Sequence, residues 1–144
     1  MYDRYAIYYT PDGPLAAAGA AWLGWDVARG QEVPHPRIDG VDVAALTDTP
    51  RKYGLHGTVK PPFVLKDGMT AEGLLRDARG FCADSAPVTL EGLALTSLGG
   101  FLALTPVGDQ TPLGALAAQA VSHLDPYRAA PTAAELERRR QGRL

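Results

Sequence analysis

The order of the predicted elements indicates an α+β fold, in which helices cover one face of a mostly antiparallel sheet and a groove lies on the other. The aromatic and β-branched run RYAIYYT, at residues 4–10, ends at a proline and predicts a strand. Two later segments, 69–85 and 112–124, carry apolar residues at helical spacing. Between them, residues 87–106 contain two strand-like runs separated by a Gly-Gly pair, which is typical of a hairpin.

The first helix is expected to follow the first strand directly. Asp12 stands at its cap position and Pro14 suits its first turn. Residues 26–50 are polar, contain several Gly and Pro, and show at most a short helical turn at Val43–Leu46. A connection of this length predicts a lid, a binding loop or a mobile segment. A second strand is then predicted over 53–65.

The remaining helices have recognisable beginnings. Thr70 is the expected cap of the helix within 69–85. Near the end of the chain, Thr132 and Glu135 have the spacing of a capping box, which predicts the start of another helix.

The composition is that of a soluble, cytoplasmic protein. The 144 residues carry a net charge of −2, which disfavours a surface that attracts duplex nucleic acid or anionic membrane. The single cysteine, Cys82, excludes an internal disulfide and is expected to lie on a buried helix face. The N-terminus does not resemble a signal peptide, and no apolar run is long enough to span a membrane.

The stretch YGLHGTVKPPF contains the residues with the clearest chemistry. In an extended strand, residues two apart share a face, so His56, Thr58 and Lys60 are expected to project together. An imidazole, a hydroxyl and an ammonium suit a phosphate group. Tyr53 and Tyr8 are further candidates for contacting a ligand. The alternative is that these residues line the solvated face of a half-buried sheet. No cluster has metal-ligand spacing and no glycine-rich phosphate loop precedes a helix, so no metal or cofactor is predicted.

Four stretches in sequence order, RYAIYYTP, AAWLG, TPRKYGLHGTVKPPF and LGGFLAL, carry a resemblance to a known family. The chain resembles the two-histidine (2H), or LigT-like, phosphoesterase superfamily. More closely, it resembles the branch of phosphonate-metabolism proteins that are often encoded with phosphonate-degradation genes. The resemblance implies that residues 1–128 form one lobe of a bilobal fold, and that residues 129–144 begin a connecting helix toward a missing C-terminal lobe. It implies metal-independent hydrolysis of a phosphodiester, such as a cyclic phosphate. It also implies that His56 is a catalytic histidine and Thr58 its phosphate-holding partner.

The chain departs from this family in lacking a second His-x-Thr motif. His35 lies in a predicted loop and His123 near the end of a predicted helix, so neither replaces it. Three explanations remain open: a truncated chain, a lobe lost to proteolysis, or a homodimer in which each copy supplies one His56. The expected partner is a small phosphorylated or cyclic-phosphate substrate, with a nucleic-acid end as a weaker candidate. The alternative functions are a non-catalytic module that binds a nucleotide or phosphorylated ligand, and an inactive fragment.

Overall fold

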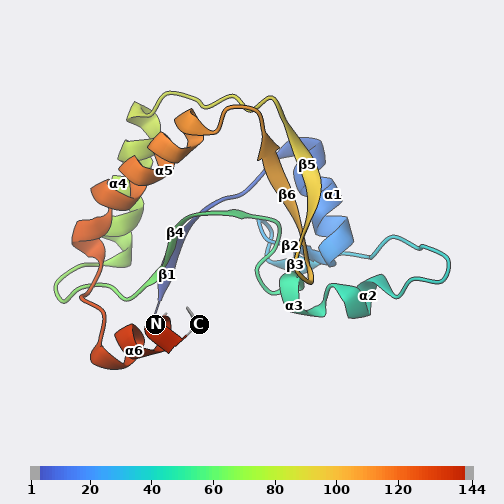
Figure 1. The fold of residues 1–144 in the computed structure, drawn as a ribbon, viewed down its shortest axis with the longest axis horizontal. Helices are drawn as coiled ribbons and strands as arrows, with labels where there is room; N and C mark the ends of the chain where they lie inside the picture. The colour runs from blue at the N-terminus through green and yellow to red at the C-terminus, as the bar shows by residue number, and fades with distance from the viewer. Residues whose placement is uncertain (1–3, 142–144) are drawn as a thin grey trace. The chain divides into compact units, whose positions relative to one another are not determined.

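The computed structural model describes residues 4–141 and has an α+β architecture (Figure 1). Its strands form three two-stranded sheets, in which β1 pairs with β4, β2 with β3, and β5 with β6. The elements are β1 (Tyr5–Tyr9), α1 (Gly13–Leu23), β2 (Trp25–Asp26), β3 (Gln31–Glu32), α2 (Val43–Leu46), α3 (Asp48–Arg51), β4 (Gly57–Phe63), α4 (Ala71–Asp84), β5 (Gly92–Leu98), β6 (Phe101–Val107), α5 (Thr111–His123), the 3-10 turn η1 (Asp125–Tyr127) and α6 (Ala133–Gln141).

The chain divides into two compact units, and each is described by itself. The "His56 unit" is formed by residues 7–59. The "Lys60 unit" is formed by the residues up to Ala6 together with those from Lys60 onward. The division runs through β1 and β4, so the expected His-x-Thr-x-Lys series is shared between the two units.

The His56 unit is built around α1, which contacts β2, α2 and α3. Pro14 lies in the first turn of α1, and Gly24 ends the helix in the left-handed region with a φ of 73°. Val43 and Thr47 from the following connection are buried. The predicted turn at Val43–Leu46 is present as α2, but the connection also contains the β2–β3 ribbon and α3, so it is more ordered than the sequence indicated.

One arginine fastens this connection to the end of α1. Arg51 donates hydrogen bonds to the carbonyl oxygens of Leu23 (3.1 Å) and Ala44 (2.9 Å), and to Nε2 of His35 (3.1 Å). Nδ1 of His35 lies 3.0 Å from the carbonyl oxygen of Trp22. Because a carbonyl oxygen only accepts, Nδ1 carries the proton, and Nε2 is left to accept from Arg51. His35 is therefore part of the scaffold of this unit.

The Lys60 unit contains α4 and α5, which lie side by side (Figure 1). Thr70 caps α4 as predicted, since its hydroxyl accepts a 3.1 Å hydrogen bond from the N–H of Gly73. The hydroxyl of Tyr127 donates to the Asp77 carboxylate at 2.6 Å, which lowers the pKa of Asp77 and ties η1 to α4. The buried apolar residues of the unit are Phe63, Leu74, Ala120, Leu124 and Tyr127.

A group of three charged side chains joins β4 to the end of α5 within the Lys60 unit. The Lys60 ammonium donates to the carbonyl oxygen of Val121 (2.9 Å) and to the Asp125 carboxylate (3.1 Å). The Arg128 guanidinium donates to both oxygens of the same carboxylate, at 2.8 and 3.2 Å. Hydrogen bonds from Arg128, and secondarily from Lys60, hold the pKa of Asp125 down at about 2.

This group predicts a loss of stability in acid. The folded-state pKa of Asp125 lies below its ordinary value of 3.8, so its contribution is present above pH 4 and disappears as the pH falls toward 2. We expect the Asp125→Asn variant to be less stable than the native chain at pH 7, and the difference between the two to shrink between pH 4 and 2. Urea unfolding followed by circular dichroism over this range measures it. A difference that stays constant with pH would contradict the assignment.

The β5–β6 hairpin pairs antiparallel in full register from Gly92 opposite Val107 to Leu98 opposite Phe101. It confirms the hairpin predicted around Gly99-Gly100. The residues of these two strands make their principal contacts with each other. The hairpin is therefore a ribbon with no third strand among the described residues.

Several expectations need correction or remain open. A single sheet was predicted, but the described strands form three separate pairs, because the hairpin does not join β4. Cys82 is exposed rather than buried. The capping box is confirmed: the N–H of Glu135 donates to the Thr132 hydroxyl at 3.2 Å, and the N–H of Thr132 to the Glu135 carboxylate at 3.1 Å.

The lobe boundary at residue 128 stays a prediction. Within residues 4–141, none of the helices has the length and apolar character needed to cross a bilayer.

Candidate functional site

Two aromatic rings frame the motif histidine inside the His56 unit. The Tyr8 ring stacks on the His56 imidazole, with ring centroids 4.0 Å apart and an interplanar angle of 28°. Nδ1 of His56 lies 3.0 Å from the carbonyl oxygen of Gly54. Nδ1 must be the donor of this hydrogen bond, because a carbonyl oxygen only accepts. The bond and the stacking fix the orientation of the ring, and Nε2 has no hydrogen-bond partner among the described residues.

The other predicted residues of this unit lie close by. The exposed Tyr53 ring is tilted against His56, with centroids 6.3 Å apart. Thr58 follows two residues after His56 in β4, and its exposed hydroxyl makes no hydrogen bond with the described part of the chain. Tyr8, Tyr53 and His56 thus lie together in this unit, and their contact with a ligand stays a prediction. Free donors on Thr58 and on a protonated His56 are the groups that a phosphate oxygen accepts from.

Lys60 does not belong to this group. The prediction that it projects with His56 and Thr58 as a phosphate ligand is wrong, because its side chain is 3% exposed and its ammonium is bound to Asp125 and Val121. The predicted strand also began too early. β4 runs from Gly57 to Phe63, so His56 precedes the strand.

Gly54 is the functional position that sequence reasoning missed. It has a φ of 67°, in the left-handed region that favours glycine, and a Cβ there would lie 2.7 Å from the Cβ of Val27. Only glycine fits this close approach, and the turn it forms aims its carbonyl oxygen at His56. The signal was present in the sequence as a glycine two residues before the histidine.

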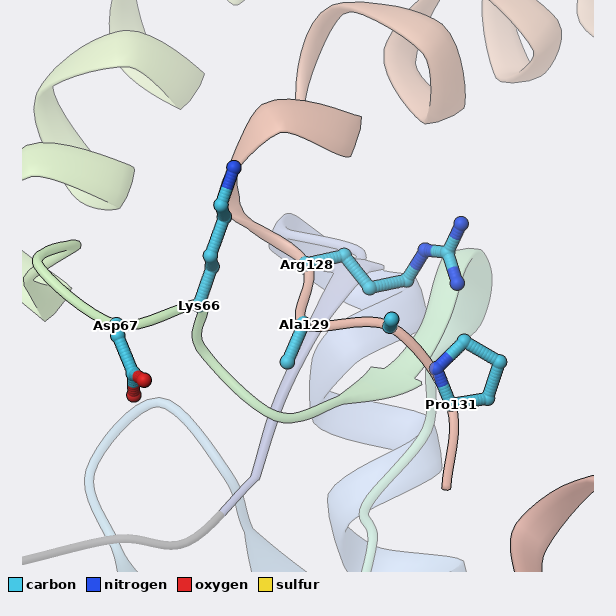
Figure 2. Close-up of a pocket in the computed structure, with 6 residues that line it drawn as sticks. Lys66, Asp67, Arg128, Ala129 and Pro131 are labelled. Carbon is cyan, nitrogen blue, oxygen red and sulfur yellow. The ribbon is translucent and has the colours of Figure 1, made fainter. Parts of the chain in front are cut away.

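A cavity with a volume of about 540 Å³ lies in the Lys60 unit. Its lining residues are Lys66, Asp67, Arg128, Ala129, Ala130 and Pro131. Figure 2 shows the side chains of Lys66, Asp67 and Arg128 projecting in different directions. Arg128 is already bound to Asp125, and Asp67 adds a negative charge. The cavity therefore lacks a converging set of donors. Within residues 4–141, no three His, Cys, Asp or Glu side chains are grouped to hold a metal ion.

The described residues thus form an α+β protein that holds the His56 imidazole in a fixed orientation, two positions before the exposed Thr58. A family model described as protein of unknown function (DUF1045) matches residues 58–144, so the chain belongs to that family. No solved structure matches the chain.

Two curated relatives carry the same name, ribose 1,5-bisphosphate phosphokinase PhnN. The protein of Janthinobacterium sp. (strain Marseille) is 40% identical over 98% of this chain and 32% of its own length. The protein of Laribacter hongkongensis (strain HLHK9) is 33% identical over 85% of this chain and 30% of its own length. The chain thus spans about a third of the relatives it matches. Together, these comparisons support a phosphonate-metabolism family, which is the coarser part of the resemblance.

The relatives overturn the expected activity. A metal-independent phosphodiesterase was predicted, and with it the hydrolase class, but both relatives are named as phosphokinases. A kinase transfers a phosphoryl group to an acceptor, whereas a hydrolase passes it to water. The resemblance misled because a histidine and a hydroxyl suited to a phosphate do not determine what is done to that phosphate.

Proposed function

We propose that this chain binds a phosphorylated pentose in a phosphonate-metabolism protein of the ribose 1,5-bisphosphate phosphokinase kind. The orientation of His56 is the observation that carries the proposal. With Nδ1 donating to Gly54 and one ring face covered by Tyr8, the unpartnered Nε2 is the atom left to meet a ligand. In the imidazolium form, Nε2 donates a charge-assisted hydrogen bond to a phosphate oxygen.

The Thr58 hydroxyl supplies the second donor in this proposal, and the exposed Tyr53 ring borders the same histidine. The sequence contains no glycine-rich nucleotide loop of the kind that holds ATP phosphates in many kinases. We therefore assign the sugar phosphate, and not the phosphoryl donor, to this part of the protein. The relatives' names support the choice of ligand, since they specify ribose 1,5-bisphosphate.

At the level of the fold, we propose that the chain shares the lobe architecture of the 2H phosphoesterase superfamily without its hydrolytic activity. The helix α6, which opens at the predicted capping box, would then lead toward a further lobe. We propose the cytoplasm as its location, which fits the single cysteine.

Calorimetric titration with ribose 1,5-bisphosphate tests the proposed site. We expect the native chain to bind this ligand and not unphosphorylated ribose. His56→Asn keeps a donor for Gly54 but removes the atom at Nε2, and Thr58→Val removes the hydroxyl at constant volume. Each is expected to weaken binding at least tenfold, because a hydrogen bond to a charged group contributes about 1.5–3 kcal/mol.

Two matched variants complete this experiment. Thr58→Ser keeps the hydroxyl and is expected to retain most of the affinity. His123→Ala removes a histidine at the end of α5, where its ring contacts Phe81, and is expected to bind like the native chain. Unchanged affinity in both His56→Asn and Thr58→Val would refute the proposed site.

A further inference from the structure

The turn that leads into β4 is held to α1 at two places, near its start and near its end. At the start, Nε of Arg51 donates to the carbonyl oxygen of Leu23 at 3.1 Å. At the end, Leu55 lies so close to Gly19 that a Cβ added to the glycine would be 2.8 Å from the Cβ of Leu55. Gly19 and Leu23 are four residues apart, share one face of the helix and are both buried. The buried face of α1 is therefore the base on which residues 51–55 rest.

Backbone hydrogen bonds link the start of this turn to the imidazole. The N–H of Gly54 donates to the carbonyl oxygen of Arg51 at 3.2 Å. Gly54 is buried, and the side chain of Val27 lies against it. The carbonyl oxygen of Gly54 in turn accepts the 3.0 Å hydrogen bond from Nδ1 of His56. A continuous series of two hydrogen bonds therefore runs from the backbone of Arg51 to the ring of His56.

The Arg51 side chain is engaged by acceptors from three other segments of the His56 unit. Besides the bond to Leu23, Nη2 donates to the carbonyl oxygen of Ala44 at 2.9 Å and to Nε2 of His35 at 3.1 Å. These acceptors belong to the end of α1, to α2 and to the connection between β3 and α2. A planar guanidinium can donate in several fixed directions at once, which the single ammonium of a lysine does not reproduce. The arginine therefore fixes the start of the turn against all three segments.

We propose that Arg51 is a positioning residue for the candidate site. It holds the turn so that the Gly54 carbonyl oxygen meets Nδ1–H of His56, which fixes the tautomer and leaves Nε2 for a ligand. Tyr8 covers one face of the ring, but stacking does not distinguish the two ring nitrogens, so the hydrogen bond decides the tautomer. This role deepens the proposed function and rests on it only where ligand binding is measured.

The tautomer of His56 tests this role without any ligand. Nitrogen-15 NMR correlation spectra at about pH 8.5, where an ordinary imidazole is neutral, show which ring nitrogen carries the proton. We expect Nδ1–H in the native chain. Arg51→Ala is expected to give a mixture of both tautomers, because the Gly54 carbonyl oxygen is then no longer held in one direction. The same variant is expected to bind ribose 1,5-bisphosphate at least tenfold more weakly in the calorimetric titration.

Two further variants complete the comparison. Arg51→Lys keeps the charge and one donor, so it serves as the test if the alanine variant does not fold, and it is expected to give a mixture of tautomers as well. Arg37→Ala removes an exposed arginine from the connection between β3 and α2, and it is expected to keep the native tautomer and affinity. Circular dichroism shows whether each variant is folded.

The results separate positioning from other roles of Arg51. The proposal is overturned if Nδ1–H persists in a folded Arg51→Ala, or in Arg51→Lys where the alanine variant does not fold. Weaker binding with an unchanged tautomer would mean that Arg51 contacts the ligand itself. A mixture of tautomers in Arg37→Ala would also overturn the proposal, because any change in the connection would then act on His56. If the native chain shows Nδ1–H, loses it in the Arg51 variants and binds no ribose 1,5-bisphosphate, only the proposed function fails.

Discussion

Replacing Lys60 with alanine is expected to destabilise the protein by about 2–3 kcal/mol, since it removes a buried charge that donates to a carboxylate and a carbonyl. The ammonium also lies 5.3 Å from the centre of the Phe63 ring, a distance at which the ring attracts a cation. Without Lys60, the Val121 carbonyl loses its side-chain donor and a void remains in the core of the unit. Urea unfolding at pH 7 measures the change.

Lys66→Ala provides the matched control, because Lys66 is a lysine six positions further along the chain whose side chain is exposed. Its replacement is expected to change the free energy of unfolding by less than about 0.5 kcal/mol. Lys60→Met keeps the apolar stem and is expected to fall between the two. If Lys60 were a ligand contact instead, its alanine variant would lose affinity for ribose 1,5-bisphosphate and keep its stability.

Gly19→Ala is expected to destabilise the His56 unit by about 1–2 kcal/mol, although the same change usually stabilises a helix. A Cβ at this position in α1 would lie 2.8 Å from the Cβ of Leu55 and 3.2 Å from its Cγ. Either the helix or Leu55 must move to make room. Since Leu55 directly precedes His56, we also expect weaker binding at the proposed site. Thermal unfolding and the calorimetric titration measure the two effects.

Gly80 is the control for this prediction, because it lies inside α4 with no atom within 4 Å of the added Cβ. Gly80→Ala is expected to stabilise the protein by about 0.5–1 kcal/mol, as a helical glycine in open space should. Stabilisation by both changes would show that Leu55 yields easily and that the contact with Gly19 is not tight.

Local patterns predicted the elements well, because their causes are local. The Thr70 cap, the Thr132–Glu135 capping box and the hairpin around Gly99-Gly100 each depend on residues within a few positions of one another. The pairing of strands was predicted poorly. Which edges meet depends on residues far apart in the chain, and alternation within one strand does not specify them.

The same limit explains the two outcomes at the motif. Alternation predicted that Thr58 and Lys60 project together, but Thr58 is exposed whereas Lys60 is buried. What buries Lys60 is Asp125, 65 residues away. The stacking of Tyr8 on His56 likewise joins distant segments, and only the aromatic character of the first strand hinted at it. The carbonyl of Gly54 acts through the backbone, which residue identity does not display.

The hydrogen bonds made by Arg51 determine where the long connection between α1 and α3 can accept insertions or deletions. One guanidinium bonds to the end of α1, to Ala44 in α2 and to His35, so it links these three points of the connection. Length variation in this connection is best accommodated at the tips near Gly30 and Gly40, where a Cβ would meet no other atom. Protein engineers grafting a recognition peptide onto this molecule should begin at those tips.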